Sequence, residues 1–186
     1  MASRSLLNIP NILTLIRVAL IPVLVLVACS HYEHKALAAA IIFAVASITD
    51  WFDGYLARAL NQTSAFGRFL DPVADKLMVG SALVILVQWH PSVWMVMPAI
   101  VIISREITIS ALREWMAEIG KRASVAVSYV GKLKTAAQMV SINVLLLHWP
   151  LVDEVGYVLL YVAAVLTIWS MLVYLRAAWP DLRDAD

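Results

Sequence analysis

Long apolar runs alternate along the chain with short polar stretches. Each run holds about 18–24 mostly apolar residues, enough for an α-helix to cross the ~30 Å hydrocarbon core of a bilayer. The runs are Leu13–Ser30, Ala36–Arg58, Arg68–Trp89, Val93–Trp115, Val125–His148 and Val155–Ala178. Turn-forming or polar segments separate them. The pattern predicts an all-α integral membrane protein with six transmembrane helices.

Composition agrees with this prediction. Hydrophobic residues make up 62% of the 186 residues and charged residues 15%, and the mean hydropathy is +0.84, well above the values of soluble domains. No linker or repeat divides the chain, so we expect a single membrane-embedded domain over residues 1–186. The first apolar run has no small-residue cleavage site after it and is expected to be retained. Cys29 is the only cysteine, which excludes an internal disulfide.

The basic residues orient the six predicted spans. Thirteen of them fall toward one side of the membrane: Arg4, Arg17, Arg58, Arg68, Lys76, Arg105, Arg113, Lys121, Arg122, Lys132, Lys134, Arg176 and Arg183. Only Lys35 falls toward the other side. By the positive-inside rule the basic side, with both ends of the chain, faces the cytoplasm.

Four aspartates occupy one short window of this oily chain. Asp50 and Asp53 stand three residues apart near the end of the second span, and Asp71 and Asp75 stand four apart near the start of the third. Each pair therefore shares one helix face. Because the connection between the two spans is short, we expect antiparallel neighbours whose four carboxylates converge at the cytoplasmic end.

Such a cluster needs positive charge nearby. Ionised carboxylates that crowd together in a partly dehydrated site repel one another, and Arg58 and Lys76 at the edges are too few to balance them. One divalent cation, or two about 3.5–4 Å apart, would neutralise the cluster. Oxygen ligands without His or Cys favour Mg²⁺ or Mn²⁺ over Zn²⁺.

Small residues flank the aspartates. Gly54 follows Asp53, and Gly67 ends the connection between the spans. A missing side chain suits a place where a ligand approaches the backbone closely. Tight packing between helices explains Gly54 and Ala57 equally well when they are taken alone.

The window resembles the signature of the CDP-alcohol phosphatidyltransferases at every fixed position. The matching pattern is Asp50-x2-Asp53-Gly54-x2-Ala57-Arg58-x8-Gly67-x3-Asp71-x3-Asp75. The similarity extends through NIPNILTLIRVALIP, SREITISALREWMAEIGKR and GKLKTAAQM, which look like the bacterial members that use glycerol 3-phosphate. It therefore covers nearly the whole chain.

The resemblance implies a fold and a reaction. Members of the family form six-helix bundles, usually homodimers, that transfer a phosphatidyl group from CDP-diacylglycerol to an alcohol and release CMP. By the family pattern Asp50, Asp53 and Asp71 hold two Mg²⁺ ions, or Mn²⁺, and Asp50 and Asp71 bridge both. Asp75 is the general base and also touches the second metal. The absence of an obvious nucleophile in the window favours direct attack on phosphorus.

The resemblance also implies contacts with the CDP-diacylglycerol donor. The matching positions are Asn11, Ile12, Leu13, Thr14, Gly54, Ala57, Arg58, Ser64 and Gly67. A guanidinium such as that of Arg58 suits bidentate phosphate binding. The simpler alternatives are a helix cap after Pro10 for Asn11 and Thr14, and a polar loop for Ser64.

Basic residues beyond the window suit the acceptor. Glycerol 3-phosphate carries a dianionic group, so its pocket needs cations. Arg105 and Arg113 stand two turns apart on the fourth span and Lys134 lies early in the fifth; we expect these three to bind the phosphate, with Glu106 as an ion-pair partner. Lys121 and Arg122 are interpreted as topology determinants. The four histidines, His31, His34, His90 and His148, fall toward the outer face and are assigned no chemistry.

Two alternatives remain at this point. The first is the same reaction with another acceptor, such as inositol phosphate or serine. Only the segments after the signature argue against it. A cation transporter would instead spread acidic groups through the membrane depth, whereas these aspartates cluster at one end. We therefore expect a phospholipid-synthesising enzyme of the bacterial inner membrane, with its active site facing the cytoplasm, surrounded by membrane lipids and without a nucleic-acid partner.

Overall fold

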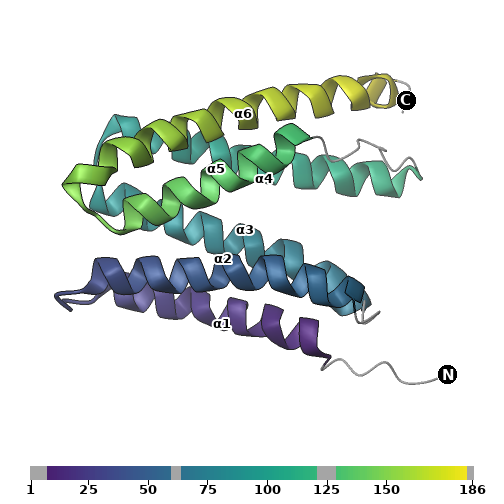
Figure 1. Ribbon diagram of the computed structural model, residues 1–186. Helices are drawn as coiled ribbons and strands as arrows, with labels where there is room; N and C mark the ends of the chain where they lie inside the picture. The colour runs from purple at the N-terminus through teal and green to yellow at the C-terminus, as the bar shows by residue number, and fades with distance from the viewer. Residues whose placement is uncertain (1–7, 60–63, 121–128, 184–186) are drawn as a thin grey trace.

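The computed structural model describes residues 8–59, 64–120 and 129–183; for residues 51, 53–59, 129, 130, 132 and 181 it describes the backbone alone. The described residues form helices and no strand. The helices are α1 (Ile9–Cys29), α2 (Lys35–Ala59), α3 (Ala65–Trp89), α4 (Val93–Glu118), α5 (Tyr129–Leu146) and α6 (Pro150–Arg183) (Figure 1). The predicted all-α bundle of six helices is confirmed.

Several helices are suited to a membrane. Within the described residues, the three that are long and apolar enough to cross a bilayer are Ile9–Cys29, Val93–Glu118 and Pro150–Pro180, and Leu133–Leu146 is a shorter apolar helix. Large apolar side chains point outward along the bundle, for example Leu26, Val84 and Val165, which are more than 60% exposed. A surface of this kind requires a lipid environment, so the protein is membrane-embedded.

The helices form two groups that α3 joins. Successive helices run in opposite directions; α1 and α2 lie together in one group, α4, α5 and α6 lie together in the other, and α3 contacts both groups (Figure 1). The beginning of α1 and the end of α6 lie at the same end of the bundle. We call this the open end, and we call the end that carries the three short turns at residues 30–34, 90–92 and 147–149 the closed end.

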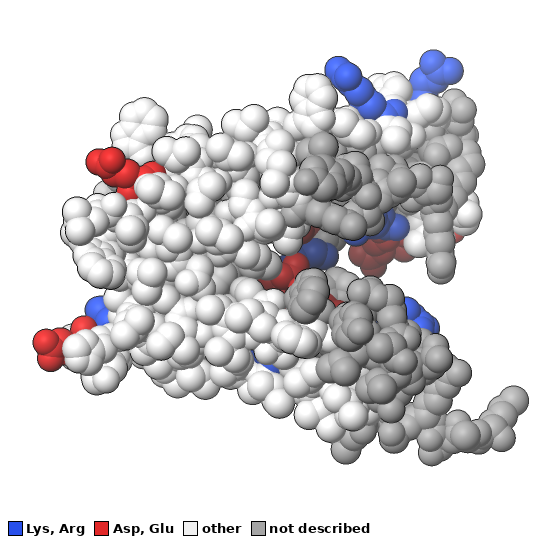
Figure 2. Space-filling view, viewed as in Figure 1, with Lys and Arg blue, Asp and Glu red and all other residues white. Residues whose placement is uncertain are grey.

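The apolar core lies toward the closed end. Its fully buried members come from all six helices and include Leu24, Phe43, Leu83, Leu86, Met95, Ile102, Leu145 and Leu160. Gly156 lets α6 approach α5 here, because a β-carbon at that position would lie 2.7 Å from Leu145 Cγ. Toward the open end the two groups diverge, and Figure 2 shows a hollow between them in which acidic and basic side chains are visible.

The first residues of α1 and α3 differ from the sequence predictions. α1 begins at Ile9 rather than Leu13, because the Asn8 side chain caps it by accepting a hydrogen bond from the Asn11 amide. The interpretation of Asn11 or Thr14 as a helix cap is therefore wrong, since both lie inside α1. α3 begins at Ala65 rather than Arg68, because Ser64 is its N-cap.

Candidate active site

A buried arginine on α1 contacts the first aspartate. Arg17 is 1% exposed, and its Nη1 donates to Asp50 Oδ1 on α2 at 2.5 Å. The Asp50 side chain remains 41% exposed, so it lies at the border between the packed helices and the hollow. A charge-assisted hydrogen bond from a buried guanidinium restricts the orientation of this carboxylate.

A threonine one turn earlier on α1 contacts the second pair of aspartates. Thr14 is fully buried, and its hydroxyl donates to Asp71 Oδ1 on α3 at 2.5 Å. Asp50 also lies within electrostatic range of Asp71. Since Thr14 and Arg17 stand three residues apart, one face of α1 positions carboxylates from both α2 and α3.

The same face of α1 continues to Asn11. The Ser64 hydroxyl donates to Asn11 Oδ1 at 2.9 Å and accepts a hydrogen bond from the Gly67 amide at 2.9 Å. A β-carbon on Gly67 would lie 2.6 Å from Asn11 Oδ1. In this structure the space beside Gly67 is thus filled by Asn11, and Ser64 acts as a helix cap rather than as a plain polar loop residue.

Asp75 connects the acidic site to the second group of helices. It lies within electrostatic range of both Asp50 and Glu106. Together with Glu106, Lys134 and Gln138 it lines a cavity of about 30 Å³, enough to hold a water molecule. The described aspartates Asp50, Asp71 and Asp75 therefore converge, as the sequence predicted.

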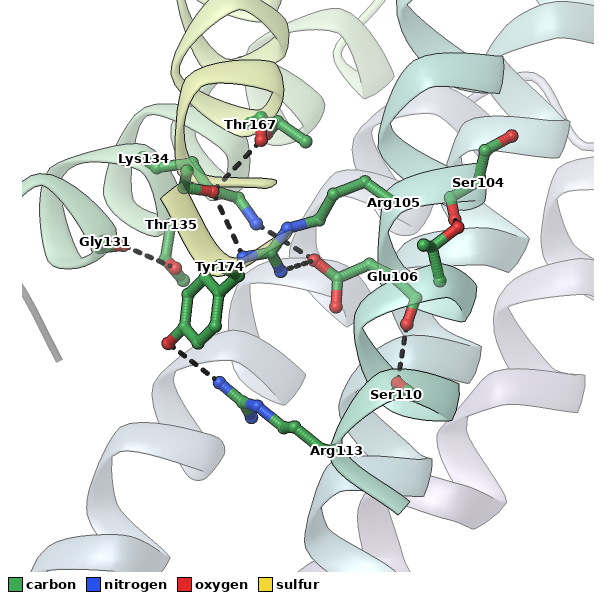
Figure 3. A network of polar contacts seen from close by, with 12 residues as sticks. Ser104, Arg105, Glu106, Ser110, Arg113, Gly131, Lys134, Thr135, Thr167 and Tyr174 are labelled. Carbon is green, nitrogen blue, oxygen red and sulfur yellow. Dashed lines mark hydrogen bonds and ion pairs between the residues drawn. The ribbon is translucent and has the colours of Figure 1, made fainter. Parts of the chain in front are cut away.

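A charged network follows on α4 and α5. Glu106 Oε1 accepts from Arg105 Nη1 and from Lys134 Nζ, both at 2.9 Å (Figure 3). Arg105 Nη2 also donates to Ser170 Oγ on α6 at 3.2 Å. The expected ion-pair role of Glu106 is present: its Oε1 contacts both Arg105 and Lys134, and Lys134 lines the same small cavity as Asp75.

Arg113 reaches the network through Tyr174 of α6. Its Nη2 donates to the Tyr174 hydroxyl at 3.1 Å. The Arg113 guanidinium lies 5.4 Å from the centre of the Tyr174 ring and that of Arg105 lies 6.0 Å from it. Both distances are in the cation–π range. Arg105, Arg113 and Lys134 thus gather around Glu106 and Tyr174 (Figure 3).

An apolar groove leads away from this site. It has a volume of about 790 Å³ and lies mainly between α3 and α4, with Lys76 and Glu106 at its polar margin and residues such as Val84 and Ile103 along its length. An amphiphilic molecule could place its polar group at the charged site and its hydrocarbon in such a groove.

Other predicted positions lie outside the described side chains or away from these contacts. The side chains of Asp53, Gly54, Ala57, Arg58 and Lys132, and the residues Lys121 and Arg122, are outside the part of the chain that the structure describes. Ile12 is 42% exposed and Leu13 is half-buried, whereas the neighbouring Asn11 and Thr14 are buried.

Sequence reasoning missed two residues of the site. Arg17 was interpreted only as a topology determinant, although a charged group inside an apolar run is costly unless it has a partner, and this signal could have identified it. Tyr174 gave no signal, because one tyrosine in an apolar helix is common; only its position between two arginines distinguishes it.

The described site fits hard divalent cations. Its carboxylates at Asp50, Asp71 and Asp75 offer oxygen ligands alone, which suit Mg²⁺ or Mn²⁺. Arg17 and Thr14 each hold one oxygen, Oδ1, of Asp50 and Asp71, and so the geometry leaves the second oxygen of each carboxylate for another partner. Three converging carboxylates also repel one another, which favours added positive charge between them.

Fold and site together define a membrane-embedded helical bundle with an acidic site beside a network of cations. Residues 7–169 match the family model of the CDP-alcohol phosphatidyltransferases, and the chain belongs to this family. Relatives from Shigella flexneri, Shigella boydii and Escherichia coli are each 57% identical to it over 180 residues. Each match covers 95% of this chain and 98% of the relative, and each relative is named CDP-diacylglycerol–glycerol-3-phosphate 3-phosphatidyltransferase.

Proposed function

We propose that the protein transfers the phosphatidyl group of CDP-diacylglycerol to glycerol 3-phosphate, giving phosphatidylglycerophosphate and CMP. The relatives that are 57% identical carry this activity in their names, and the family comprises CDP-alcohol phosphatidyltransferases. In this proposal residues 1–186 act as a single membrane-embedded catalytic domain.

One observation supports the proposal above all others: Asp75 lies at the junction of two unlike sites. On one side Asp50 lies within its electrostatic range, and on the other side Glu106 and Lys134 line the same cavity. A transfer between two substrates needs such a junction, since the reacting atoms must meet within about 3–3.5 Å.

The aspartates are proposed to hold the metal. Asp50, Asp53, Asp71 and Asp75 would bind two Mg²⁺ ions, or Mn²⁺, and Arg17 and Thr14 would keep Asp50 and Asp71 oriented toward them. Bound ions of this kind offset negative charge on a diphosphate and on its leaving oxygen. The donor would also contact Asn11, Gly54, Arg58, Ser64 and neighbouring positions of the family pattern, including Ile12, Leu13, Ala57 and Gly67.

Asp75 is proposed as the general base. It takes the proton of the acceptor hydroxyl while that oxygen forms a bond to the phosphorus that carries the diacylglycerol. The bond between this phosphorus and the oxygen that links it to CMP breaks, and CMP leaves with the electron pair. Direct transfer of this kind needs no covalent phosphatidyl-enzyme.

The cationic network is proposed to select the acceptor. Arg105, Arg113 and Lys134 supply guanidinium and ammonium groups suited to a phosphate dianion. Glu106 holds Arg105 and Lys134 together before substrate arrives. An alcohol without an anionic group would give these cations no partner, so binding would favour glycerol 3-phosphate over such an alcohol.

The setting of the reaction is proposed from the same features. The basic open end, where α1 begins and α6 ends, would face the cytoplasm, and the six helices would cross the bacterial inner membrane in a multi-pass arrangement among its lipids. By analogy with the family we expect a homodimer and no nucleic-acid partner.

An acceptor panel tests this function. The protein, purified in detergent, is incubated with CDP-diacylglycerol, Mg²⁺ and either glycerol 3-phosphate, inositol phosphate, serine or no acceptor, and released CMP is measured. We expect release with glycerol 3-phosphate alone. Release with another alcohol would change the acceptor but keep the reaction, whereas no release with any alcohol would contradict the enzyme and favour the transporter alternative.

A further inference from the structure

Two histidines and an aspartate meet at the closed end of the bundle, opposite the proposed active site. His90 follows α3, His148 lies in the turn between α5 and α6, and Asp153 is in the first turn of α6. Their ligand atoms all lie within 4.8 Å of one another. The residues are separated by up to 63 positions in the sequence, so only the fold brings them together.

We propose that His90, His148 and Asp153 form a binding site for a transition-metal ion of the Zn²⁺ class. Two imidazole nitrogens and one carboxylate oxygen are a donor set that such ions prefer, whereas Mg²⁺ and Ca²⁺ prefer oxygen ligands. The site is thereby chemically distinct from the all-oxygen site of the aspartates.

The distance between the two rings matches a shared metal. His148 Nδ1 lies 3.2 Å from His90 Nε2. Two nitrogens bound at 2.0–2.1 Å to one tetrahedral zinc are about 3.3 Å apart. The two rings are inclined to each other by 71°, and their centres lie 4.7 Å apart. A direct N–H···N hydrogen bond has a similar length, and the experiment below separates the two.

Asp153 provides the second, independent observation. Its Oδ1 atom is buried and has no hydrogen-bond partner among the residues that the structure describes. A buried carboxylate oxygen without a partner is costly, and a bound cation removes that cost. The N-terminus of α6 also tolerates the negative charge, but this effect does not supply a partner for Oδ1.

Aromatic side chains flank the cluster. The ring of Tyr157 stands edge-on to His90 at 5.9 Å between centres, and Trp89 lies 6.0 Å from His148. His148 remains exposed, so an ion can reach the site from the surface of the protein. The metal would join the turn at residues 90–92 to the turn at residues 147–149 and thereby add a link between the ends of α3 and α6, beside the contact of His90 with Tyr157.

Zinc titration of the tag-free protein in detergent tests the site. Saturating Mg²⁺ is present throughout to occupy the aspartates, and binding is measured by calorimetry. We expect one Zn²⁺ per chain, and binding at least about tenfold weaker in His90→Ala and in Asp153→Asn. His148→Asn serves as a third variant, because His148 has φ +51° and Asn tolerates this backbone conformation better than Ala.

The matched control changes the other two histidines of the same end. His31→Ala/His34→Ala removes imidazoles that are exposed in the turn between α1 and α2 and should leave zinc affinity unchanged. Co²⁺ should give the visible absorption of a tetrahedral site in the parent and in this control, but not in His90→Ala. Zn²⁺ should also raise the melting temperature of the parent and not that of His148→Asn.

The opposite results would overturn the proposal. Equal zinc affinity in the parent, His90→Ala and Asp153→Asn would show that the three residues only pack and hydrogen-bond with one another. Loss of binding in the His31/His34 control would place the ion elsewhere. Gel filtration and circular dichroism of each variant establish that it is folded, and the measurement does not depend on the proposed transferase activity.

Discussion

The two ends of the bundle are formed by the same helices but differ in the side chains that they bury. At the closed end all six helices contribute apolar side chains to one core, for example Phe43, Leu83 and Met95. At the open end the buried side chains include Thr14, Arg17 and Lys134, and the helix groups diverge around them (Figure 2). Apolar packing at the closed end therefore fixes the positions of the helices, and these positions place the polar side chains at the open end.

This difference shows why the site can tolerate so many charges. The two buried cations of the open end that the structure describes each have a carboxylate partner on another helix: Arg17 with Asp50 and Lys134 with Glu106. Such pairs contribute little net stability because desolvation offsets their attraction. The apolar core at the closed end must then supply the hydrophobic stabilisation. Variants at the two ends should therefore affect different properties: stability at the closed end and activity at the open end.

The largest effect is expected at the junction residue. Asp75→Asn keeps the shape of the side chain but removes the base, so CMP release should fall by about 10²–10⁴-fold. Binding of CDP-diacylglycerol and the melting temperature should change little. Glu154→Gln, the same change in an exposed acid at the closed end, is the control and should keep full activity. Retained turnover in Asp75→Asn would contradict its role.

The ion pair between Arg17 and Asp50 should affect both stability and activity. Arg17→Met leaves Asp50 without its guanidinium. Breaking a fully buried pair costs about 3–5 kcal/mol, and because Asp50 is 41% exposed, solvent should reduce this loss to about 2–3 kcal/mol. Thermal unfolding in detergent measures it, and the KM for CDP-diacylglycerol should rise as well.

The double variant separates the two effects of Arg17. In Arg17→Met/Asp50→Asn no carboxylate at position 50 is left without its partner, so the melting temperature should recover in part. Activity should stay lost, because Asp50 is proposed to hold metal. Equal stability of Arg17→Met and the parent protein would show that the pair does not hold α1 to α2.

Sequence and structure agree best where a single helix carries the information. Asp71 and Asp75 share a face of α3 by spacing alone, and the apolar runs predict the helices because a bilayer requires them. The helix starts were less predictable, since the caps at Asn8 and Ser64 depend on local hydrogen bonds. Because α1 begins at Ile9, four residues before Leu13, Asn11 lies inside the helix.

Contacts between helices could not be predicted from the spacing. Arg17 and Asp50 are 33 residues apart, and Thr14 and Asp71 are 57 apart. No periodicity within one helix relates such pairs. The cluster of His90, His148 and Asp153 illustrates the same limit at the closed end, where the sequence assigned its histidines no chemistry.

A smaller effect, on stability alone, is expected at the closed end. In Gly156→Ala the new β-carbon would lie 2.7 Å from Leu145 Cγ and 3.2 Å from Val144 Cγ1, so α5 and α6 must shift at a cost of about 1–3 kcal/mol. Gly80→Ala, where the β-carbon meets nothing within 4 Å, is the control. The melting temperature should fall only in Gly156→Ala, while the KM values of Gly156→Ala remain those of the parent.

The smallest effect should distinguish the charge of the acceptor network from its packing. Arg113→Ala removes one of three cations and should raise the KM for glycerol 3-phosphate by about tenfold, since one charge-assisted hydrogen bond contributes about 1.5–3 kcal/mol. Tyr174→Phe removes the hydroxyl that Arg113 contacts at 3.1 Å but keeps the ring, so the KM should rise only about two- to threefold. The KM for CDP-diacylglycerol should stay constant in both variants. If the KM for CDP-diacylglycerol rises as much as that for glycerol 3-phosphate, α4 and α6 support the structure of the whole open end and do not form a separate binding site for the acceptor.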